Sequence, residues 1–231
     1  MTKYNLDING IEIFQGFSSA DKKTLSKYFS DKLYGLLRIK KKPPIKDYHK
    51  WFKKHDIDHE KLMSAKNRHF IPPNYISKIF FGKHKIFYEF LKKKVGNYLI
   101  HDEGLGSLSF RLIRPHKFND GYGLSKKSWG PGGKLYSVFI PISEIDELNS
   151  LGLVVDSHKK KYKKKLHHKS KFCKSEYRFS GDLKKIKIKR FALKSTQCII
   201  FHHELLHCEE VDQNAKNTRF SVEIRFKKIE Q

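Results

Sequence analysis

Apolar residues in the first third of the chain recur with the period of an α-helix. The pattern predicts a helix over residues 18–37, which a serine pair can cap and whose apolar positions lie three or four residues apart (Leu25, Phe29, Leu33, Leu36 and Leu37). The lysine and proline run at 40–44 ends this helix, because proline lacks the N–H that continues the hydrogen-bond ladder. Further helices are predicted over 45–54, 58–65, 73–81 and 83–95, the last ending at Gly96.

After Gly96 the pattern changes to short apolar, β-branched and aromatic runs separated by turn residues, which is typical of β-strands. Strands are predicted over 97–101, 107–114, 134–142, 151–155, 185–192, 197–203 and 218–227. The last strand alternates most clearly, with four apolar residues on one face (Phe220, Val222, Ile224 and Phe226). Helices followed by many short strands indicate an α+β protein with a sandwich or barrel core. We expect a single domain over 1–231, mainly helical at 1–96 and with its β core at 97–231.

The net charge of the chain bears on the kind of partner it could bind. The chain has 49 Lys and Arg against 24 Asp and Glu, a formal net charge of +25. Such an excess attracts phosphate-bearing or acidic partners, although a lysine bias from AT-rich coding would produce it equally. The run HKKKYKKKLHHKSKFCK at 158–174 is too charged for a core and is expected to form an exposed insertion between strands. Rings among lysines can bind single-stranded nucleic acid, but a solvated insertion is the interpretation that we favour.

The three cysteines, Cys173, Cys198 and Cys208, have no regular spacing, which indicates a reducing compartment rather than a disulfide scaffold. The N-terminal segment has no signal-peptide core, and no stretch approaches the roughly 20 apolar residues of a membrane span. We therefore expect a cytoplasmic protein without a membrane span.

His203, Glu204 and His207 form an H-E-x-x-H sequence, which on a helix would bind zinc and supply a general base. The preceding residues 198–201, CIIF, favour a strand, and the 24 residues after His207 favour another strand rather than a helix with a third ligand. A zinc hydrolase is therefore a minor alternative, and His202 and His203 are expected to be strand residues without a catalytic role.

The C-terminal segment FHHELLH…N…TRFSVE resembles the end of the 2-oxoglutarate and Fe(II)-dependent oxygenases. The resemblance implies that His207 is the distal iron ligand and that Arg219 forms a forked pair with the far carboxylate of 2-oxoglutarate. It also places Asn214 and Ser221 among the cofactor-binding residues. The implied fold is a double-stranded β-helix, a cupin-like jelly-roll, with the N-terminal helices packed against it.

Upstream segments extend the resemblance to roughly residues 108–227. FRLIRPHKFNDGYGLSKKSW, then KLYSVFIPI, then LGLVV and SHK at 151–159 are similar to a phytanoyl-type subgroup found in bacterial polysaccharide and natural-product clusters. In that subgroup an H-x-D motif supplies the other two iron ligands of a facial triad. Aligned on Gly123–Leu124 and Ser128–Trp129, these two positions are Ser125 and Lys127 in this chain.

Serine is a poor Fe(II) ligand and a lysine ammonium repels the cation, so the altered motif leaves two hypotheses. His116 and Asp120 could replace the lost ligands, giving an oxygenase that binds Fe(II) and 2-oxoglutarate and hydroxylates a sugar or natural-product intermediate. A phosphorylated substrate would suit the positive charge. Alternatively, Lys127 fills the metal position, and the protein is a pseudo-oxygenase that binds an anionic ligand or a partner. We assign no catalytic residue, and Arg219 and His207 are the site residues that we expect in either case.

Overall fold

The computed structural model describes residues 4–38, 42–52, 85–96, 98–100, 108–116, 120, 123–129, 135–168 and 176–228. Its helices include α1 (Leu6–Asn9), α2 (Ser19–Leu36), α3 (Tyr48–Trp51) and α7 (Lys85–Val95). The predictions over 18–37 and 83–95 are confirmed by α2 and α7, and Ser18 Oγ caps α2 by accepting from the N–H of Asp21 at 3.1 Å. The predicted helices at 58–65 and 73–81 lie outside the described residues. No helix in the described ranges has the length and apolar character needed to cross a bilayer.

The main sheet is antiparallel and has the strand order β1-β8-β4-β10-β2, with β3 also pairing with β10. Its strands are β1 (Ile11–Gln15), β2 (Tyr98–Ile100), β3 (Leu108–Ile113), β4 (Leu135–Pro141), β8 (Gln197–His202) and β10 (Arg219–Lys228). The strands predicted over 97–101, 107–114, 134–142, 197–203 and 218–227 are confirmed. The sequence pattern did not predict β1.

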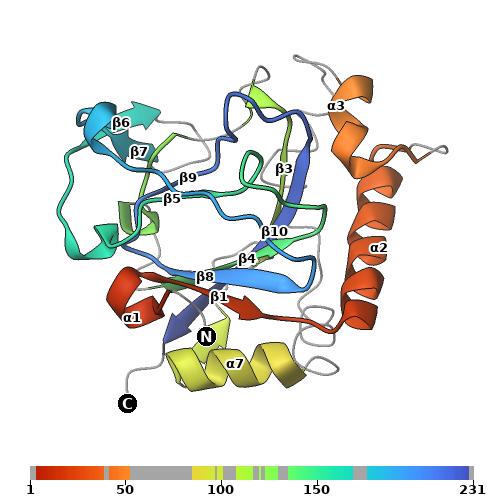
Figure 1. The fold of residues 1–231 in the computed structure, drawn as a ribbon, viewed down its shortest axis with the longest axis horizontal. Helices are drawn as coiled ribbons and strands as arrows, with labels where there is room; N and C mark the ends of the chain where they lie inside the picture. Colours follow the sequence, from red (N-terminus) through yellow and green to blue (C-terminus); the bar gives the residue numbers. More distant parts are fainter. Residues whose placement is uncertain are drawn as a thin grey trace.

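A second, smaller layer lies beside the main sheet (Figure 1). In it β5 (Gly152–Leu153) pairs with β9 (His207–Cys208), and single bridges join Ser125 to His207 and Leu153 to Lys189. The hairpin of β6 (Lys164–His168) and β7 (Glu176–Phe179) extends this layer, because the Phe179 N–H donates to Leu124 O at 2.8 Å. The basic insertion expected at 158–174 thus contains an ordered strand, and residues 169–175 lie outside the described ranges.

The strand predicted over 185–192 is wrong. Residues 183–185 form a short 3₁₀ turn, and only Lys189 makes a bridge. Pairing stops there because β5, its neighbour, is only two residues long and already pairs with β9 along its other edge. Gly152 in β5 has to be glycine, since a Cβ atom there would lie 2.5 Å from Cys208 Sγ.

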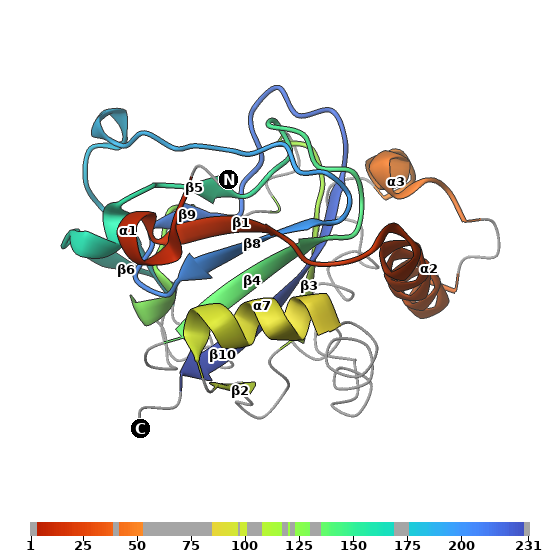
Figure 2. The same cartoon turned by 60° about the horizontal axis from the view of Figure 1, so that its bottom comes forward.

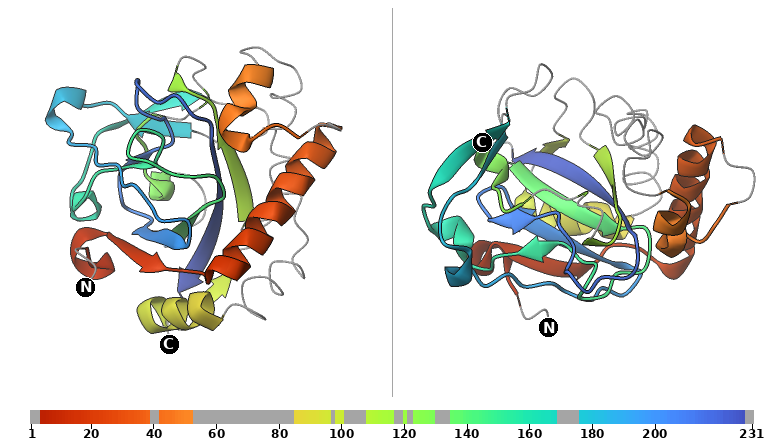
Figure 3. Two further views of the ribbon diagram at one scale, coloured as in Figure 1. Left: turned by 45° about the vertical axis from the view of Figure 1, so that its right-hand side comes forward. Right: turned by 90° about the horizontal axis from the view of Figure 1, so that it is seen from above.

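The two faces of the main sheet differ in chemistry. Helices α2 and α7 cover its outer face, where apolar residues of β10 and the helices share one cluster (Figures 2 and 3). The predicted face of β10 is confirmed there, with all four members buried (Phe220, Val222, Ile224 and Phe226). The inner face looks toward the second layer, and on β4 and β8 it is also apolar (Phe139, Ile199 and Phe201). On β10 it is polar, and this difference positions the candidate site.

Replacing Phe87 with alanine tests whether α7 is docked through this outer cluster. Phe87 is fully buried and its ring contacts the rings of Phe14, Phe17 and Phe226. We expect Phe87→Ala to lower the free energy of unfolding by about 3–5 kcal/mol, because it leaves a cavity. The neighbouring Ile86 is exposed, so Ile86→Ala should change it by less than about 0.5 kcal/mol. Denaturant unfolding of both variants measures the difference, and equal losses would contradict the docking.

Candidate functional site

The inner face of β10 carries a row of polar side chains. Alternation along the strand puts Arg219, Ser221, Glu223 and Arg225 on the face opposite the apolar row. Arg219 and Ser221 are fully buried and Glu223 is 6% exposed. Arg111 on β3 lies directly opposite Ser221 in the register and is also buried. A sheet whose inner face is charged needs compensating groups nearby, because an unpaired buried charge is costly.

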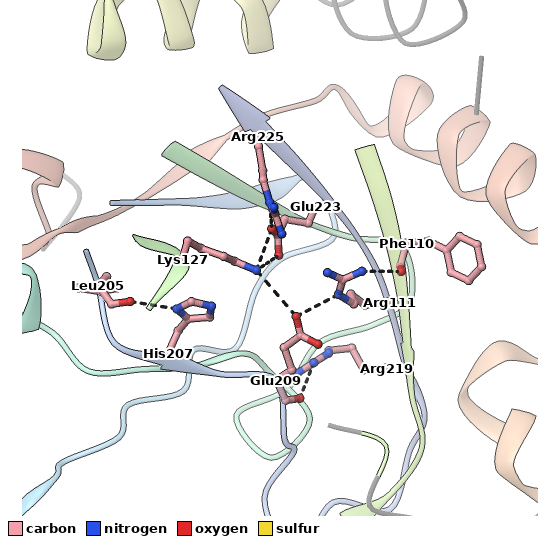
Figure 4. A network of polar contacts seen from close by, with 9 residues as sticks. All are labelled: Phe110, Arg111, Lys127, Leu205, His207, Glu209, Arg219, Glu223 and Arg225. Carbon is pink, nitrogen blue, oxygen red and sulfur yellow. Dashed lines mark hydrogen bonds and ion pairs between the residues drawn. The ribbon is translucent and has the colours of Figure 1, made fainter. Parts of the chain in front are cut away.

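Lys127 supplies much of that compensation (Figure 4). Its Nζ lies 3.0 Å from one carboxylate oxygen of Glu223 and 3.9 Å from Oε1 of Glu209. The same Glu209 oxygen accepts from Arg111 Nε at 3.0 Å, and Glu223 Oε1 accepts from Arg225 Nε at 3.0 Å. The Lys127 side chain is 13% exposed and both carboxylates are less than 10% exposed. The result is a nearly buried ionic network that joins β3, β9 and β10 to the segment 123–129.

Both carboxylates of the network are ionised. Burial alone would raise the pKa of Glu209, but the charges of Arg111 and Lys127 outweigh it and lower that pKa to about 2. Burial acts on Glu223 in the same way, and there Lys127, Arg225 and Arg111 hold the pKa well below its ordinary value. These two carboxylates therefore stay charged throughout the physiological pH range, whereas burial lowers the pKa of the Lys127 ammonium between them.

His207 lies beside this network and is 2% exposed. Its Nδ1 is 2.9 Å from Leu205 O, so Nδ1 carries the proton and donates, and Nε2 keeps a lone pair. Burial and the nearby charge of Lys127 lower the pKa of His207 to about 4. Its main chain forms two 2.9 Å hydrogen bonds with Ser125, which places the first altered motif position on the adjacent strand. The structure thus brings Ser125, Lys127 and His207 together.

Arg219 makes its hydrogen bonds to the main chain. Nη1 donates to Asn149 O at 3.2 Å and Nη2 donates to Glu209 O at 2.6 Å. Burial lowers the pKa of this guanidinium to about 10, so it remains charged. Its Nε and the hydroxyl of Ser221 are buried without a hydrogen-bond partner among the described residues. Both are buried donor groups to which the described residues offer no acceptor.

The other residues proposed from the sequence lie elsewhere. Asp120 forms a forked pair with Arg114, at 2.7 Å from Nε and 2.6 Å from Nη2, while His116 is exposed. Asn214 is exposed in the loop before β10. Within the described ranges, no three His, Cys, Asp or Glu side chains are arranged to hold a metal ion.

The zinc-helix interpretation of residues 203–207 is wrong. Strand β8 ends at His202, a turn follows, and His207 begins β9. His203 in the turn and His207 in β9 therefore do not lie one helical turn apart on a helix. His203 has Glu204 Oε1 3.5 Å from its Nε2, and Lys126 Nζ lies 3.4 Å from the other oxygen of Glu204.

Sequence reasoning missed Arg111 and Glu209 as members of the site. Arg111 stands at an inward position of an alternating strand, FRLI, and an arginine there is a detectable signal for a charged interior. Glu209 carries no comparable signal in the sequence around it. Its ionic partners come from β3 and from residue 127, which the local sequence does not reveal.

Several solved structures have a similar architecture. The non-heme monooxygenase ThoJ superposes with a TM-score of 0.57 at 12% identity, covering 96% of this chain and 75% of ThoJ. EctD from S. alaskensis gives the same TM-score and identity over 96% and 74%. The epimerase SnoN, solved with Fe³⁺, α-ketoglutarate and nogalamycin RO, gives 0.55 at 10% identity over 96% and 80%. Neither a family model nor a curated protein matches the sequence.

The chain shares its fold with non-heme iron and 2-oxoglutarate enzymes. Identities of 10–12% support the fold alone. EctD has been solved with bound Fe and, separately, with 2-oxoglutarate and 5-hydroxyectoine. The described residues around His207 do not suit an iron ion, because the Lys127 ammonium, paired with Glu223, lies beside His207 and the bridged neighbour of His207 is Ser125, a serine with no anionic group.

The depressed pKa of His207 predicts a pH dependence of stability. An unfolded histidine has a pKa of about 6.5, so below that pH the unfolded state binds a proton that the folded state excludes until about pH 4. The contribution of His207 to the free energy of unfolding is fully present above about pH 6.5. It falls as the pH is lowered, by about 2 kcal/mol between pH 7 and pH 5. Urea unfolding at these two pH values measures the loss, which His207→Gln should reduce.

His202 adds to the same trend, since burial and its neighbour His203 lower its pKa to about 4. The His202→Gln variant is therefore the matched comparison for His207→Gln. Each single variant should remove only part of the loss of unfolding free energy between pH 7 and pH 5. A wild-type stability that does not change between pH 7 and pH 5 would contradict the lowered pKa of both rings.

Proposed function

We propose that the protein is a pseudo-oxygenase, which uses the oxygenase fold to bind a small anion rather than to carry out iron-dependent oxidation. The observation that carries this proposal is the position of Lys127 Nζ, beside His207 and 3.0 Å from Glu223. A positive charge already stands where the resemblance expects two metal ligands, and a second cation there would be repelled. The jelly-roll arrangement suggested by the resemblance is supported by the two layers and their bridges.

The charge of the interior supports an anionic ligand. Four cationic side chains (Arg111, Lys127, Arg219 and Arg225) face two carboxylates (Glu209 and Glu223), which leaves an excess of 4 − 2 = +2 with His207 neutral. An excess of this kind in a nearly dry environment acts strongly on a nearby anion. The unpaired Arg219 Nε and Ser221 hydroxyl offer hydrogen bonds to it. A small molecule with a carboxylate or phosphate group meets both requirements.

Anaerobic titration with Fe(II) and 2-oxoglutarate tests the loss of iron chemistry. The wild-type protein should show no saturable charge-transfer band in the visible range. The matched control is the double variant Ser125→His with Lys127→Asp, which restores H-x-D next to His207 and removes the competing ammonium. We expect this variant to gain Fe(II) binding, and His207→Ala in the same background to abolish it.

Two outcomes would contradict this account. A wild-type band that His207→Ala or Arg219→Ala abolishes would establish an oxygenase with unusual ligands and remove the pseudo-oxygenase proposal. A double variant that folds normally and binds no Fe(II) would show that residues 125 and 127 do not stand at the ligand positions.

Anion binding is tested separately on the metal-free protein. Succinate and inorganic phosphate, each compared with chloride at equal ionic strength, should raise the melting temperature saturably if they bind the folded state. Lys127→Gln lowers the interior excess to +1 and should weaken the apparent affinity about tenfold, roughly 1.4 kcal/mol. Lys27→Gln, on the exposed Lys27–Asp31 pair, is the charge-matched control and should leave the affinity unchanged. Equal effects of chloride and the test anions would refute a specific site.

A further inference from the structure

The end of the molecule formed by residues 159–166 and 183–188, here called the basic face, carries a dense array of lysines. Residues 159–165 contain six lysines and residues 184–187 contain three, and all nine are exposed. The ion pairs of lysines in the described parts of the chain involve other residues, such as Lys27, Lys42, Lys94 and Lys127. Asp182, the acidic residue beside the second group, caps the N–H of Lys184 at 3.0 Å. The basic face therefore presents its charge to solvent.

These lysines are held on an ordered scaffold. The strands β6 and β7 pair, and Ser180 N–H donates to Lys163 O at 3.1 Å. Lys126 Nζ donates to Lys160 O at 2.8 Å and so fixes the start of the lysine run to the protein body. Tyr162, Phe179 and Ile186 pack against one apolar cluster, which brings the two lysine groups to the same end of the molecule (Figures 1 and 2).

Exposed aliphatic side chains lie among the lysines. Leu166 is 49% exposed, Leu183 64% and Ile188 39%, and each has a lysine or histidine next to it in the chain. Single exposed apolar residues are common, but three in one strongly basic region form a combined apolar and cationic surface. The described aromatic rings of the region are only partly exposed (Tyr162, Tyr177 and Phe179), and two of them have a cation nearby: Lys126 Nζ lies 5.2 Å from the Tyr162 ring centroid and Lys164 Nζ lies 4.4 Å from that of Tyr177.

This combination selects among polyanionic partners. Proteins that bind single-stranded nucleic acid stack bases on exposed rings, and here the described rings are partly buried while the aliphatic side chains are the exposed apolar groups. The exposed leucine and isoleucine side chains would bury no apolar surface against a phosphate backbone. At a bilayer surface, lysines are attracted to anionic headgroups while aliphatic side chains enter the interface. We propose that the basic face is a docking surface for a membrane rich in anionic lipids, independent of the interior site.

Cosedimentation with vesicles tests the proposal on the full chain. The protein should bind vesicles of phosphatidylcholine with about 30% phosphatidylserine and should not bind phosphatidylcholine alone, and raising the salt should weaken the binding. The triple variant Lys184→Glu, Lys185→Glu and Lys187→Glu should partition at least about 100-fold more weakly, since each lysine near an anionic surface contributes roughly a factor of five. Replacing Leu183 with Asn and Ile188 with Thr should weaken the binding that persists at high salt.

Matched controls separate this surface from the overall charge. Lys23→Glu, Lys92→Glu and Lys93→Glu change the net charge equally at exposed positions of α2 and α7 and should retain most of the binding. Leu36→Gln with Ile86→Gln removes equally exposed aliphatic groups from those helices and should have no effect. Equal losses in the basic-face and control variants would overturn the proposal. Absence of vesicle binding, with duplex or single-stranded nucleic acid bound through the basic face instead, would overturn it as well.

Discussion

A nearly buried ammonium group is the constraint on which the site and much of the second layer depend. Lys127 Nζ lies between Glu223 of β10 and Glu209, which follows β9. Taking these charges out of water is favourable only with close partners, and removing one partner from such a network commonly costs about 3–5 kcal/mol. Segment 123–129 must therefore stay close to β10, and β9 must stay close to β3 through Arg111 and Glu209. Ionic pairing thus fixes positions that apolar packing would leave adjustable.

The same constraint explains how the interior of this fold can hold positive charge. A metal centre concentrates positive charge inside a barrel and is compensated by anionic ligands. Here the positive charge is covalently part of the chain, and Glu223 and Glu209 compensate it. Arg219 is likewise integrated into the structure, since it holds the main-chain oxygens of Asn149 and Glu209. Ligand binding in this interior would therefore act on groups that already have structural partners.

Local patterns predicted the parts of the fold that local chemistry determines. The alternation of β10 identified its apolar face, and the capped period of α2 gave its bounds. The resemblance placed Ser125, Lys127 and His207 in one region, and in the structure these three residues are neighbours. The pattern over 185–192 failed because alternation describes a strand only if a neighbour has a free edge, and β5 is too short to provide one. The Arg111–Glu209 pair was missed since it joins residues 98 positions apart.

Segment 123–129 connects the interior network with the basic face. Its side chains alternate, so Ser125 and Lys127 face His207 and Glu223, while Leu124 and Lys126 face the cluster beneath the hairpin. Lys126 donates to Lys160 O on that side, and Leu124 O accepts from Phe179 N–H. Because Ser125 and Ser128 flank the two lysines, a shift of one residue would leave a lysine at only one of the two positions, so that either Glu223 or Lys160 O would lose its ammonium donor. The paired hydrogen bonds between Ser125 and His207 prevent this shift, and thereby hold both surfaces in register.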